Sequence, residues 1–535
     1  MAALPLFGVA FARAQGQGAA QPAASTSTST AASTLTSTSA SIVGSASASS
    51  SSTPTEPDDD DVESTNASPD DNGGEGKLNL HYELETVRIR GNKRTRDRII
   101  LRYVPFRPGD ELDVDDDRLE QIRFRLLGTG YFSDVQLSLS KGPRRGVVIL
   151  NIDVVERNTL VVNDLWLGAS ADATPEGRHR PFTAFGGVDV AENNFFGTGI
   201  AVSAAIAVAD RQQGYRLRFA DPTFLGSKWI VSASLLYNNA RDFFGVSGVL
   251  SDNQPNAGAC DCAVATYTRR GGEIGAGLDL STSARFRLGY HLELIEASLP
   301  RAASEQRGYV AVEPIAFHLI DGRSVLSYLS VALDDDTRDD PVLPTQGHFV
   351  QLGSDFGLSP LGSDYSFLRL QTRVQQWWTL PWKEHVFRLD VFGGAVFGDA
   401  PLFMRFYVGD LSDFLPDRAL DLNFDRRPPP NFLRTTVTWM RYEEFAARVN
   451  GEYRIPIYRG HRSIYGIDFF GSGGFFLLGS ARDFNDPAAG YHGFSRIPID
   501  LTFNVGVRMQ TSAGGFAFAF SNIIGFLPIR STGGP

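Results

Sequence analysis

The sequence predicts an all-β transmembrane barrel over residues 158–529, preceded by a small α/β domain over residues 81–157. Two observations predict the barrel. From about residue 160 to residue 529, apolar side chains alternate with charged ones in one short run after another, and aromatic residues often fall at the ends of these runs. Because successive side chains of a strand point to opposite faces, each run needs one apolar and one polar environment. A closed barrel with lipid outside and a wet lumen inside provides both.

The clearest run covers residues 285–294. Leu288, Leu292 and the other apolar residues share one face, while Arg287, Glu293 and the other polar residues share the opposite face. Ionised groups placed so regularly need water on their side. Further runs of the same kind start near residues 200, 229, 368, 387, 449, 501 and 516.

A large soluble all-β protein, such as a propeller or a sandwich, would also alternate. Its apolar face would be buried, so its aromatic residues should cluster near strand middles. In this sequence Trp377, Trp378 and Trp382 fall at one strand end, as expected for the interfacial girdle of a membrane barrel. The barrel is therefore the favoured interpretation, with the lipid bilayer around it.

The N-terminal region is predicted to contain a signal peptide and a linker. Residues 1–14 hold a short apolar stretch, Leu4 to Ala12, followed by Ala12-Arg13-Ala14 before a predicted cleavage at Gln15. Residues 15–80 are rich in Ala, Ser and Thr and then acidic, which predicts a disordered linker because they cannot bury enough apolar surface to fold. No other run of about eighteen apolar residues occurs, which excludes a membrane protein built of helices.

Composition excludes several functions. A net charge of -11 and a pI near 5.3 argue against a nucleic-acid partner. The two cysteines, Cys260 and Cys262, are predicted to form a disulfide in an oxidising compartment, with free thiols as the alternative. No histidine lies near them, and no catalytic signature is found, so we expect no metal site, no cofactor and no enzymatic activity.

Residues 81–157 are predicted to form a separate domain of the order β-α-α-β-β. The expected strands cover residues 82–90, 135–140 and 147–155, and the expected helices cover residues 94–103 and 114–127. In the second helix, Leu119, Ile122 and Leu126 recur at three-four spacing on one face. About 75 residues suffice for one thin core.

That domain resembles a POTRA domain, the periplasmic module of BamA-like outer-membrane assembly factors. The resemblance rests on Val87 to Asn92 at its start, Leu127 to Val135 after the second helix and Val148 to Val155 at its end. Motifs of the same superfamily follow in the expected order, at residues 192–199, 221–226, 336–348, 405–409 and 452–457. The resemblance covers about residues 82–529 and implies about sixteen antiparallel strands in the outer membrane, with the POTRA domain in the periplasm and residues 530–535 as a C-terminal tail.

The resemblance also identifies a sixth extracellular loop, which the family introduces with Arg-Phe-Tyr-x-Gly. Arg405, Phe406, Tyr407 and Gly409 match this motif. In the family, an arginine of a Val-Arg-Gly-Phe/Tyr tip enters the lumen and contacts an aspartate of a Phe-x-Asp-x-Gly strand.

Both halves of this lock are altered in the present sequence. Arg418 stands at the expected tip, but Ala419 and Leu420 replace the glycine and the aromatic residue, and Gly471 stands where the aspartate is expected. Because a lumen arginine needs a counter-charge or hydrogen bonds, Asp468 and Glu452 are the candidate partners. A solvated loop charge is the alternative reading of Arg418.

The resemblance implies a protein that inserts or translocates other proteins. Strand addition would require edge strands with unpaired backbone groups. Candidate edges carry Val135, Leu137 and Leu139 in the POTRA-like domain, and Leu165, Phe518 and Phe520 at the seam between the first and last barrel strands. Unfolded outer-membrane or secreted proteins are the expected clients, with periplasmic chaperones or lipoproteins as further candidate partners. A two-partner-type secretion pore and a structural or binding barrel without assembly activity are the alternatives.

Overall fold

The structure is a computed structural model that describes part of the chain. The described residues are 11–15, 81–113, 116–173, 179–227, 229–244, 263–281, 283–301, 303–308, 311–339, 343–382, 384–411, 418–424, 431–460, 464–511 and 514–521. Cys260 and Cys262 lie outside this set, so their predicted disulfide stays a prediction.

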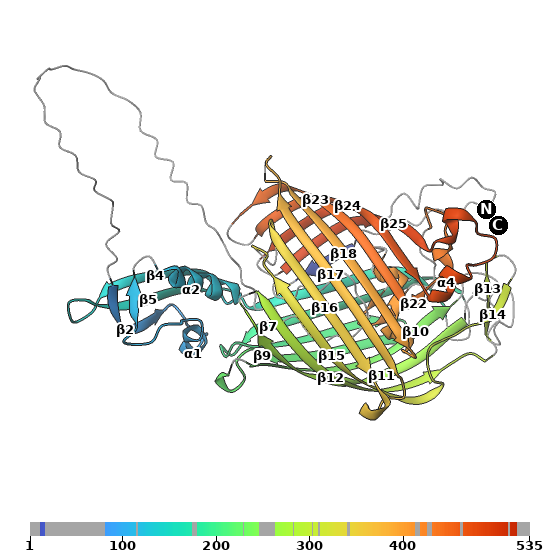
Figure 1. Ribbon diagram of the computed structural model, residues 1–535, viewed down its shortest axis with the longest axis horizontal. Helices are drawn as coiled ribbons and strands as arrows, with labels where there is room; N and C mark the ends of the chain where they lie inside the picture. The colour runs from blue at the N-terminus through green and yellow to red at the C-terminus, as the bar shows by residue number, and fades with distance from the viewer. Residues whose placement is uncertain are drawn as a thin grey trace, which may run out of the picture.

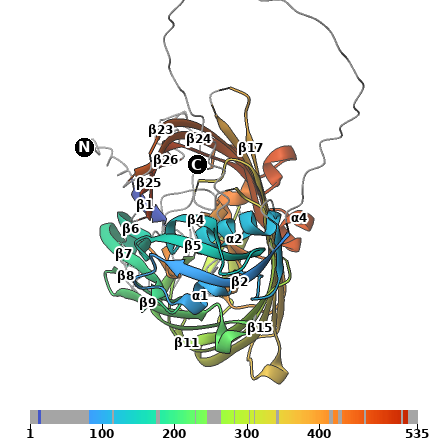
Figure 2. The ribbon, with the colours of Figure 1, turned by 90° about the vertical axis from the view of Figure 1, so that its left-hand side faces the viewer.

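One antiparallel sheet of sixteen strands dominates the molecule and curls into a barrel (Figures 1 and 2). Each strand pairs with the strand before it among the barrel strands, as in a simple meander. Fifteen strands come from the predicted region: β6 (Leu160–Ala173), β7 (His179–Phe195), β8 (Ile200–Ala209), β9 (Gln212–Asp221), β10 (Trp229–Phe244), β11 (Ala263–Asp279), β12 (Ala284–Ser298), β15 (Gly322–Asp336), β16 (Gly347–Gly357), β17 (Phe367–Thr379), β18 (Val386–Gly398), β23 (Phe445–Arg459), β24 (Ile464–Gly479), β25 (Ile499–Thr511) and β26 (Gly514–Ser521).

The sixteenth strand, β1 (Phe11–Gln15), comes from the N-terminal region. It pairs antiparallel with β26, from Phe11 opposite Ala519 to Gln15 opposite Gly515, and contacts β6 on its other side. Within the described residues no hydrogen-bonded ladder joins β1 to β6, so the two ends of the sheet meet there. The strand overlaps the predicted signal peptide, whose boundaries and cleavage stay predictions.

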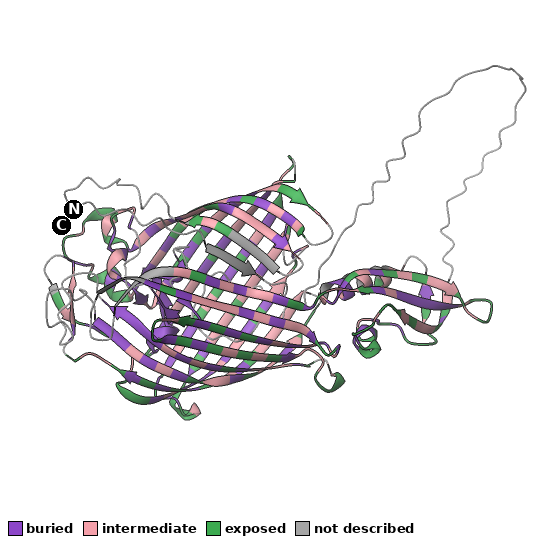
Figure 3. Ribbon diagram, turned by 180° about the vertical axis from the view of Figure 1, so that it is seen from behind, coloured by how far each residue is buried: buried purple, intermediate pink, exposed green. Residues whose placement is uncertain are grey.

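The predicted alternation is confirmed in β12. Leu288, Leu292 and Leu294 are 43%, 46% and 57% exposed on the outside, whereas His291 and Glu293 are buried inside. Figure 3 shows the same alternation of buried and exposed residues along the neighbouring strands. The outward residues of β12 are thus mostly apolar, as burial in lipid requires.

Ion pairs between neighbouring strands line much of the lumen. Arg373 of β17 binds Asp390 of β18 through two hydrogen bonds of 3.0 and 2.5 Å. Similar pairs join Arg287 to Asp334 and Arg369 to Asp355, and Arg218 of β9 reaches past β8 to Asp189 of β7. Inward charges are therefore largely balanced within the wall, which lowers the cost of removing them from bulk water.

The expectation of a wet lumen is wrong for the half of the barrel distal to the POTRA-like domain. There many inward residues are apolar, and buried side chains such as Phe244, Ile295 and Phe392 pack with buried residues of the segment between β18 and β23. Alternation alone cannot show which part of the lumen a loop fills. Where a loop covers an inward position, that position is buried as in a protein core and accepts apolar residues.

Two further loops pack together at the distal mouth (Figure 1). The hairpin of β13 (Ser304–Arg307) and β14 (Ala311–Pro314) lies against α4 (Ala481–Asn485). Ion pairs of 3.1 Å from Arg307 to Asp483 and of 2.7 Å from Arg482 to Glu313 join the two loops. No helix of the described residues is long and apolar enough to cross a membrane.

The POTRA-like domain forms a four-stranded sheet in the order β3, β2, β5, β4. Its elements are β2 (His81–Arg90), α1 (Asp97–Leu101), β3 (Glu111–Asp113), α2 (Asp117–Gly128), β4 (Phe132–Lys141) and β5 (Val147–Glu156). The five predicted elements are present, but the sequence analysis missed β3, which at three residues is too short to show a period. The predicted helical face holds, since Ile122 and Leu126 are fully buried and Leu119 packs against the same core.

The POTRA-like domain docks on the turn between β7 and β8, which is the first barrel motif, residues 192–199. Gly197 accepts a hydrogen bond from the Arg96 amide at 3.0 Å, and the Asn194 side chain donates to the Thr95 hydroxyl at 2.8 Å. The Tyr131 hydroxyl donates to the carbonyl of Gly199 at 3.1 Å. This motif therefore builds the joint between the two domains.

Candidate functional site

The segment between β18 and β23, residues 399–444, folds into the lumen and is the predicted sixth loop. Its described parts are η3 (Leu402–Met404), β19 (Phe406–Tyr407), α3 (Val408–Leu411), β20 (Arg418–Ala419), β21 (Leu422–Asn423), η4 (Thr436–Trp439) and β22 (Tyr442–Glu443). β19 pairs with β22 and β20 with β21, so the loop makes its own small ladders inside the barrel. Nearly all of these residues are buried, which makes the loop a plug.

The Arg-Phe-Tyr-x-Gly motif forms the base of this plug. Phe406 is fully buried with its ring over Gly394, where a Cβ atom would meet the ring at 2.2 Å. The Arg369 guanidinium lies 5.1 Å from the centre of the same ring. Arg405 forms a 3.5 Å ion pair with Glu444, and Gly409 is buried in the turn of α3. A glycine in the wall and an aromatic residue in the loop thus fit each other.

Arg418 lies buried in the lumen, so the alternative of a solvated loop charge is wrong. Its guanidinium forms a 3.5 Å ion pair with Asp410 and lies 4.8 Å from the ring centre of Tyr407 and 5.8 Å from that of Tyr442. All three contacts come from the loop itself. Arg418 therefore holds the loop together, and the expectation that Asp468 or Glu452 provides its counter-charge is wrong.

The tip of the plug is fixed to the barrel by an acid rather than by an arginine. Asp421, in the turn between β20 and β21, lies 2.8 Å from the guanidinium of Arg269 on β11. Arg269 is fully buried and also binds Glu293 of β12 through bonds of 2.8 and 3.0 Å. Compared with the family lock, the charges are exchanged: the carboxylate is on the loop and the guanidinium on the wall.

Backbone strain accompanies this tip. Leu420 and Asp421 have φ angles of 48° and 65°, in the left-handed region that a branched residue such as leucine rarely adopts. Such residues cost about 1–3 kcal/mol each and persist only where the surroundings hold them. The Arg269 ion pair and the close approach of Leu420 to Gly214 of β9 provide such surroundings.

Asp242 of β10 is a second anchor. It is fully buried and accepts hydrogen bonds from the Tyr267 hydroxyl at 2.7 Å, from the Asn423 side chain at 3.0 Å and from the Tyr442 hydroxyl. These donors belong to the wall, the loop tip and the returning arm of the loop. One carboxylate thus ties the tip and the returning arm of the plug to the wall.

Sequence reasoning missed Arg269 and Asp242. Alternation places both residues inward, and that is the only signal the sequence offers. Which inward residue meets the loop depends on where the loop crosses the lumen, and this is a tertiary property.

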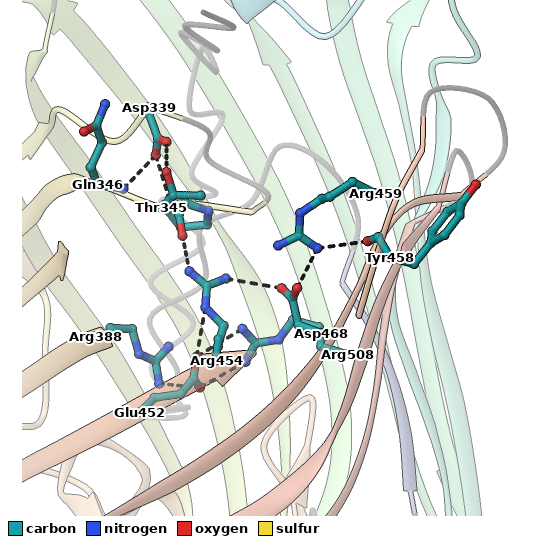
Figure 4. Close-up of polar contacts among 11 residues, drawn as sticks. Asp339, Thr345, Gln346, Arg388, Glu452, Arg454, Tyr458, Arg459, Asp468 and Arg508 are labelled. Carbon is teal, nitrogen blue, oxygen red and sulfur yellow. Dashed lines mark hydrogen bonds and ion pairs between the residues drawn. The ribbon is translucent and has the colours of Figure 1, made fainter. Parts of the chain in front are cut away.

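Glu452 and Asp468 lie instead on the β23–β24 wall, in the cluster shown in Figure 4. Glu452 lies 3.1 Å from the guanidinium groups of both Arg388 and Arg508. Asp468 lies 2.6 Å from Arg459 and 3.9 Å from Arg454. The cluster is a part of the wall rather than a lock for the sixth loop.

This cluster brings two sequence motifs together. Arg454, from the motif at residues 452–457, donates to the carbonyl of Pro344, from the motif at residues 336–348. The second motif is ordered internally, because Asp339 accepts hydrogen bonds from the amides of Thr345 and Gln346 at 2.8 and 3.1 Å (Figure 4). Arg454 thereby pins the turn between β15 and β16 to β23, three strands away.

Two family models match the chain. Residues 82–157 match the model described as POTRA, surface antigen variable number repeat, and residues 194–413 match the Omp85 superfamily domain. The chain belongs to the Omp85 superfamily. This Omp85 protein is an outer-membrane protein, and its POTRA domain lies in the periplasm. The distal mouth of the barrel is therefore extracellular.

Two curated relatives are each named outer membrane protein assembly factor BamA. The one from Nitratidesulfovibrio vulgaris is 24% identical over 348 residues, and the one from Neorickettsia risticii is 23% identical over 361 residues. The alignments cover 64% and 65% of this chain but 38% and 42% of the relatives, so the Omp85 protein spans about two fifths of their length. Among solved structures, CdiB from Escherichia coli shares the fold with a TM-score of 0.51, at 9% identity and over 82% of this chain and 76% of that chain.

The predicted client edges of this Omp85 protein lie at sheet margins. β4 is an edge strand of the POTRA sheet, and Val135 is buried in its core with Leu137 and Leu139 packed against it. Their side chains are therefore used by the domain, and only the β4 backbone faces a free edge. At the seam, Leu165 is half-buried in β6, and Phe518 and Phe520 of β26 are exposed.

Proposed function

We propose that this Omp85 protein inserts other proteins into the outer membrane by adding their strands to open edges of its own sheets. The two relatives named as assembly factors support an assembly role. Unfolded outer-membrane proteins would be its clients, delivered by periplasmic chaperones or lipoproteins, and the lipid bilayer would receive them. The process would need no enzymatic step, because strand pairing exchanges backbone hydrogen bonds only.

The observation that carries this proposal is the pairing of β26 with β1. The edge of the last described barrel strand accepts a five-residue extended segment from a part of the chain about 500 residues away in sequence. This is strand addition within one molecule. If cleavage before Gln15 removes Phe11 to Ala14 of β1, the same edge becomes available to a client.

The length of the seam strands favours opening at this position. β6 has 14 residues and β25 has 13, but β26 has 8 within the described residues and pairs with β25 only from Asn504 to Thr511. Few ladder hydrogen bonds therefore need to be broken at β26. The β1–β26 ladder covers five residue pairs, whereas every other described ladder of the barrel covers at least eight, so opening the seam breaks the fewest hydrogen bonds.

The plug argues against the lumen as the client path. Leu402, Phe403 and Phe406 are buried among wall residues across the extracellular half, and Asp421 and Asn423 tie the tip to the wall. A client passing through the lumen would have to displace this core. A client leaving through the seam would not.

Cross-linking of the seam tests the proposal. In a Cys260→Ser, Cys262→Ser background, one cysteine is placed in β6 and one in β26, and the chain that starts at Gln15 is reconstituted in phosphatidylcholine vesicles. The folding rate of a urea-unfolded barrel protein added to these vesicles is then measured by its heat-modifiable migration on gels. We expect rapid client folding under reducing conditions and folding at the rate of empty vesicles after oxidation.

A matched control uses Leu165→Cys with Val188→Cys, which are direct partners in the β6–β7 ladder. This disulfide joins strands that the proposal keeps paired, so oxidation should not slow the client. Equal client folding with the seam closed and open would reject the proposal. If the protein is instead a two-partner-type secretion pore, its depletion from cells should abolish the secretion of a single client. If it is a structural barrel, its depletion should change the level of no client.

A further inference from the structure

A strongly basic surface lies where the POTRA domain meets the barrel. Residues 88–107 hold eight Lys and Arg residues and one acidic residue, in a chain whose net charge is -11. All eight basic residues are exposed. The five nearest the barrel, called the rim cluster below, are Lys93, Arg94, Arg96, Arg98 and Arg102.

The side chains of the rim cluster are not committed to acidic partners. Among the described residues, no ion pair to Asp or Glu is formed by any of the five. Arg102 donates to the carbonyl of Pro222, in the turn between β9 and β10. Lys93, Arg94 and Arg96 use backbone amides for the contacts that order their loop, to Glu156 and to Gly197. Their charges therefore remain available to a ligand.

The position of the membrane surface is marked by exposed apolar residues at the same rim. Phe196 and Leu225, at the tips of the β7–β8 and β9–β10 turns, are 80% and 89% exposed. Trp229, Trp378 and Trp382 are also exposed at this periplasmic end. Aromatic and apolar residues at such positions sit at the boundary between acyl chains and headgroups.

The rim cluster is attached to these tips. Arg96 is bound through its amide to Gly197, the neighbour of Phe196, and Arg102 is bound to Pro222, three residues before Leu225. The basic residues are thus held at the level of the lipid phosphates. Long Arg and Lys side chains can then extend to the headgroups while the POTRA core stays outside the bilayer.

We propose that the rim cluster binds anionic phospholipid headgroups of the periplasmic leaflet. Guanidinium groups pair with phosphate oxygens in a bidentate manner, and each basic residue near an anionic surface adds to membrane attraction. The contact would fix the orientation of the POTRA domain relative to the membrane, and with it the path by which a β4 edge approaches the seam. It does not depend on the client activity proposed above.

The test measures how close the rim cluster lies to the lipid headgroups while the charge of the lipid is varied. The full chain carries bimane at Pro105→Cys, an exposed position just after the cluster, in the Cys260→Ser, Cys262→Ser background. It is placed in nanodiscs of phosphatidylcholine alone or with phosphatidylglycerol, each containing the same fraction of lipid with a nitroxide on its headgroup. We expect stronger quenching of bimane in the anionic nanodiscs and loss of the difference in high salt.

A charge variant and a matched control decide the source of the effect. Arg94→Gln, Arg96→Gln and Arg98→Gln together should weaken the docked state roughly a hundredfold and reduce quenching to the phosphatidylcholine level. Lys141→Gln, Arg144→Gln and Arg145→Gln remove the same charge from exposed sites at the β4–β5 turn, outside the basic surface, and should leave quenching unchanged. Heat-modifiable migration confirms that both variants are folded.

Three outcomes would overturn the proposal. The first is equal quenching in the two kinds of nanodisc. The second is an equal loss in both triple variants, which would mean that only domain charge matters. The third is a saturable change in bimane fluorescence when an Asp/Glu-rich unfolded peptide is added in phosphatidylcholine nanodiscs, if it requires Arg94, Arg96 and Arg98, because the cluster would then be a polypeptide site.

Discussion

Removing the guanidinium of Arg269 should loosen the plug far more than removing the charge of Asp421. Arg269 is shared by two carboxylates, Glu293 on the neighbouring strand and Asp421 on the loop tip. Arg269→Ala leaves both buried carboxylates without this guanidinium, whereas Asp421→Asn keeps the Arg269–Glu293 pair intact. The two changes at one contact therefore have unequal consequences.

The magnitudes follow from burial. Breaking a buried ion pair from one side costs about 3–5 kcal/mol, so we expect Arg269→Ala to lower the free energy of unfolding by about 4 kcal/mol. Replacing a charged acceptor by a neutral one weakens a hydrogen bond by about half, so Asp421→Asn should cost about 1 kcal/mol. Asparagine also tolerates the positive φ of this position, which keeps backbone strain out of the comparison.

The assay is urea unfolding of the protein refolded into phosphatidylcholine vesicles, followed by tryptophan fluorescence. Single-channel conductance in planar bilayers reports plug release separately, and Arg269→Ala should show large openings that Asp421→Asn shows rarely. Arg270→Ala is the matched control, since this neighbour points outward and pairs with Glu296 at 3.4 Å with both side chains about half exposed. It should cost at most about 1 kcal/mol. If Arg269→Ala were no worse than Arg270→Ala, the anchoring role of Arg269 would be refuted.

Three further predictions concern the loop and the domain joint. Arg418→Ala should lower the free energy of unfolding by about 3 kcal/mol and make the sixth loop sensitive to protease added from outside, because Asp410 loses its buried partner. Arg418→Lys should retain part of this contact, and proteolysis that is unchanged in Arg418→Ala would contradict the prediction. Gly197→Ala should loosen the joint between the POTRA domain and the barrel, because the new Cβ atom would lie 1.7 Å from a backbone oxygen, and spin labels on the two domains should then show a broader distance distribution. The control Gly226→Ala should leave that distribution unchanged, because Gly226 has a similar φ of 72° but no heavy atom within 4 Å of its Cβ position. Burial raises the pKa of Glu156, but hydrogen bonds from three backbone amides outweigh burial and keep this pKa below its ordinary value. The ionised Glu156 therefore stabilises the joint above about pH 4.5, and this stabilisation is lost as the pH falls further. Hydrogen exchange of residues 91–97 should rise at low pH in the natural protein, and Glu156→Gln should remove this pH dependence.

The barrel could be predicted from the sequence because a membrane strand obeys a local rule. In residues 285–294 the alternation alone predicts which side chains face lipid and which face the lumen. The structure places Leu292 outside and Glu293 inside, as expected. The Trp377–Trp382 girdle was only partly predicted. Trp378 and Trp382 are exposed, but Trp377 is buried against Arg338, since alternation turns every second residue inward.

The plug could be predicted only in part. The Arg405–Gly409 motif located the loop, and the inward position of Arg418 was one of two readings of the sequence. Its counter-charge could not be found, because the expected partners Asp468 and Glu452 lie on the β23–β24 wall, whereas the tip reaches β9, β10 and β11. A loop of this length can cross the lumen in many ways, and the sequence does not state which.

The sequence by itself determined the two faces of the strongly alternating strands, such as β12, and five of the six elements of the POTRA domain, because periodicity and turn residues act over a few neighbours. Only the tertiary structure decided that Asp421 meets Arg269, that Asp242 gathers three donors and that the turn at residues 192–199 carries the POTRA domain. These contacts join residues up to about 200 positions apart. Their energies depend on burial and on the exact approach of two surfaces, and neither quantity is written in the local pattern of the chain.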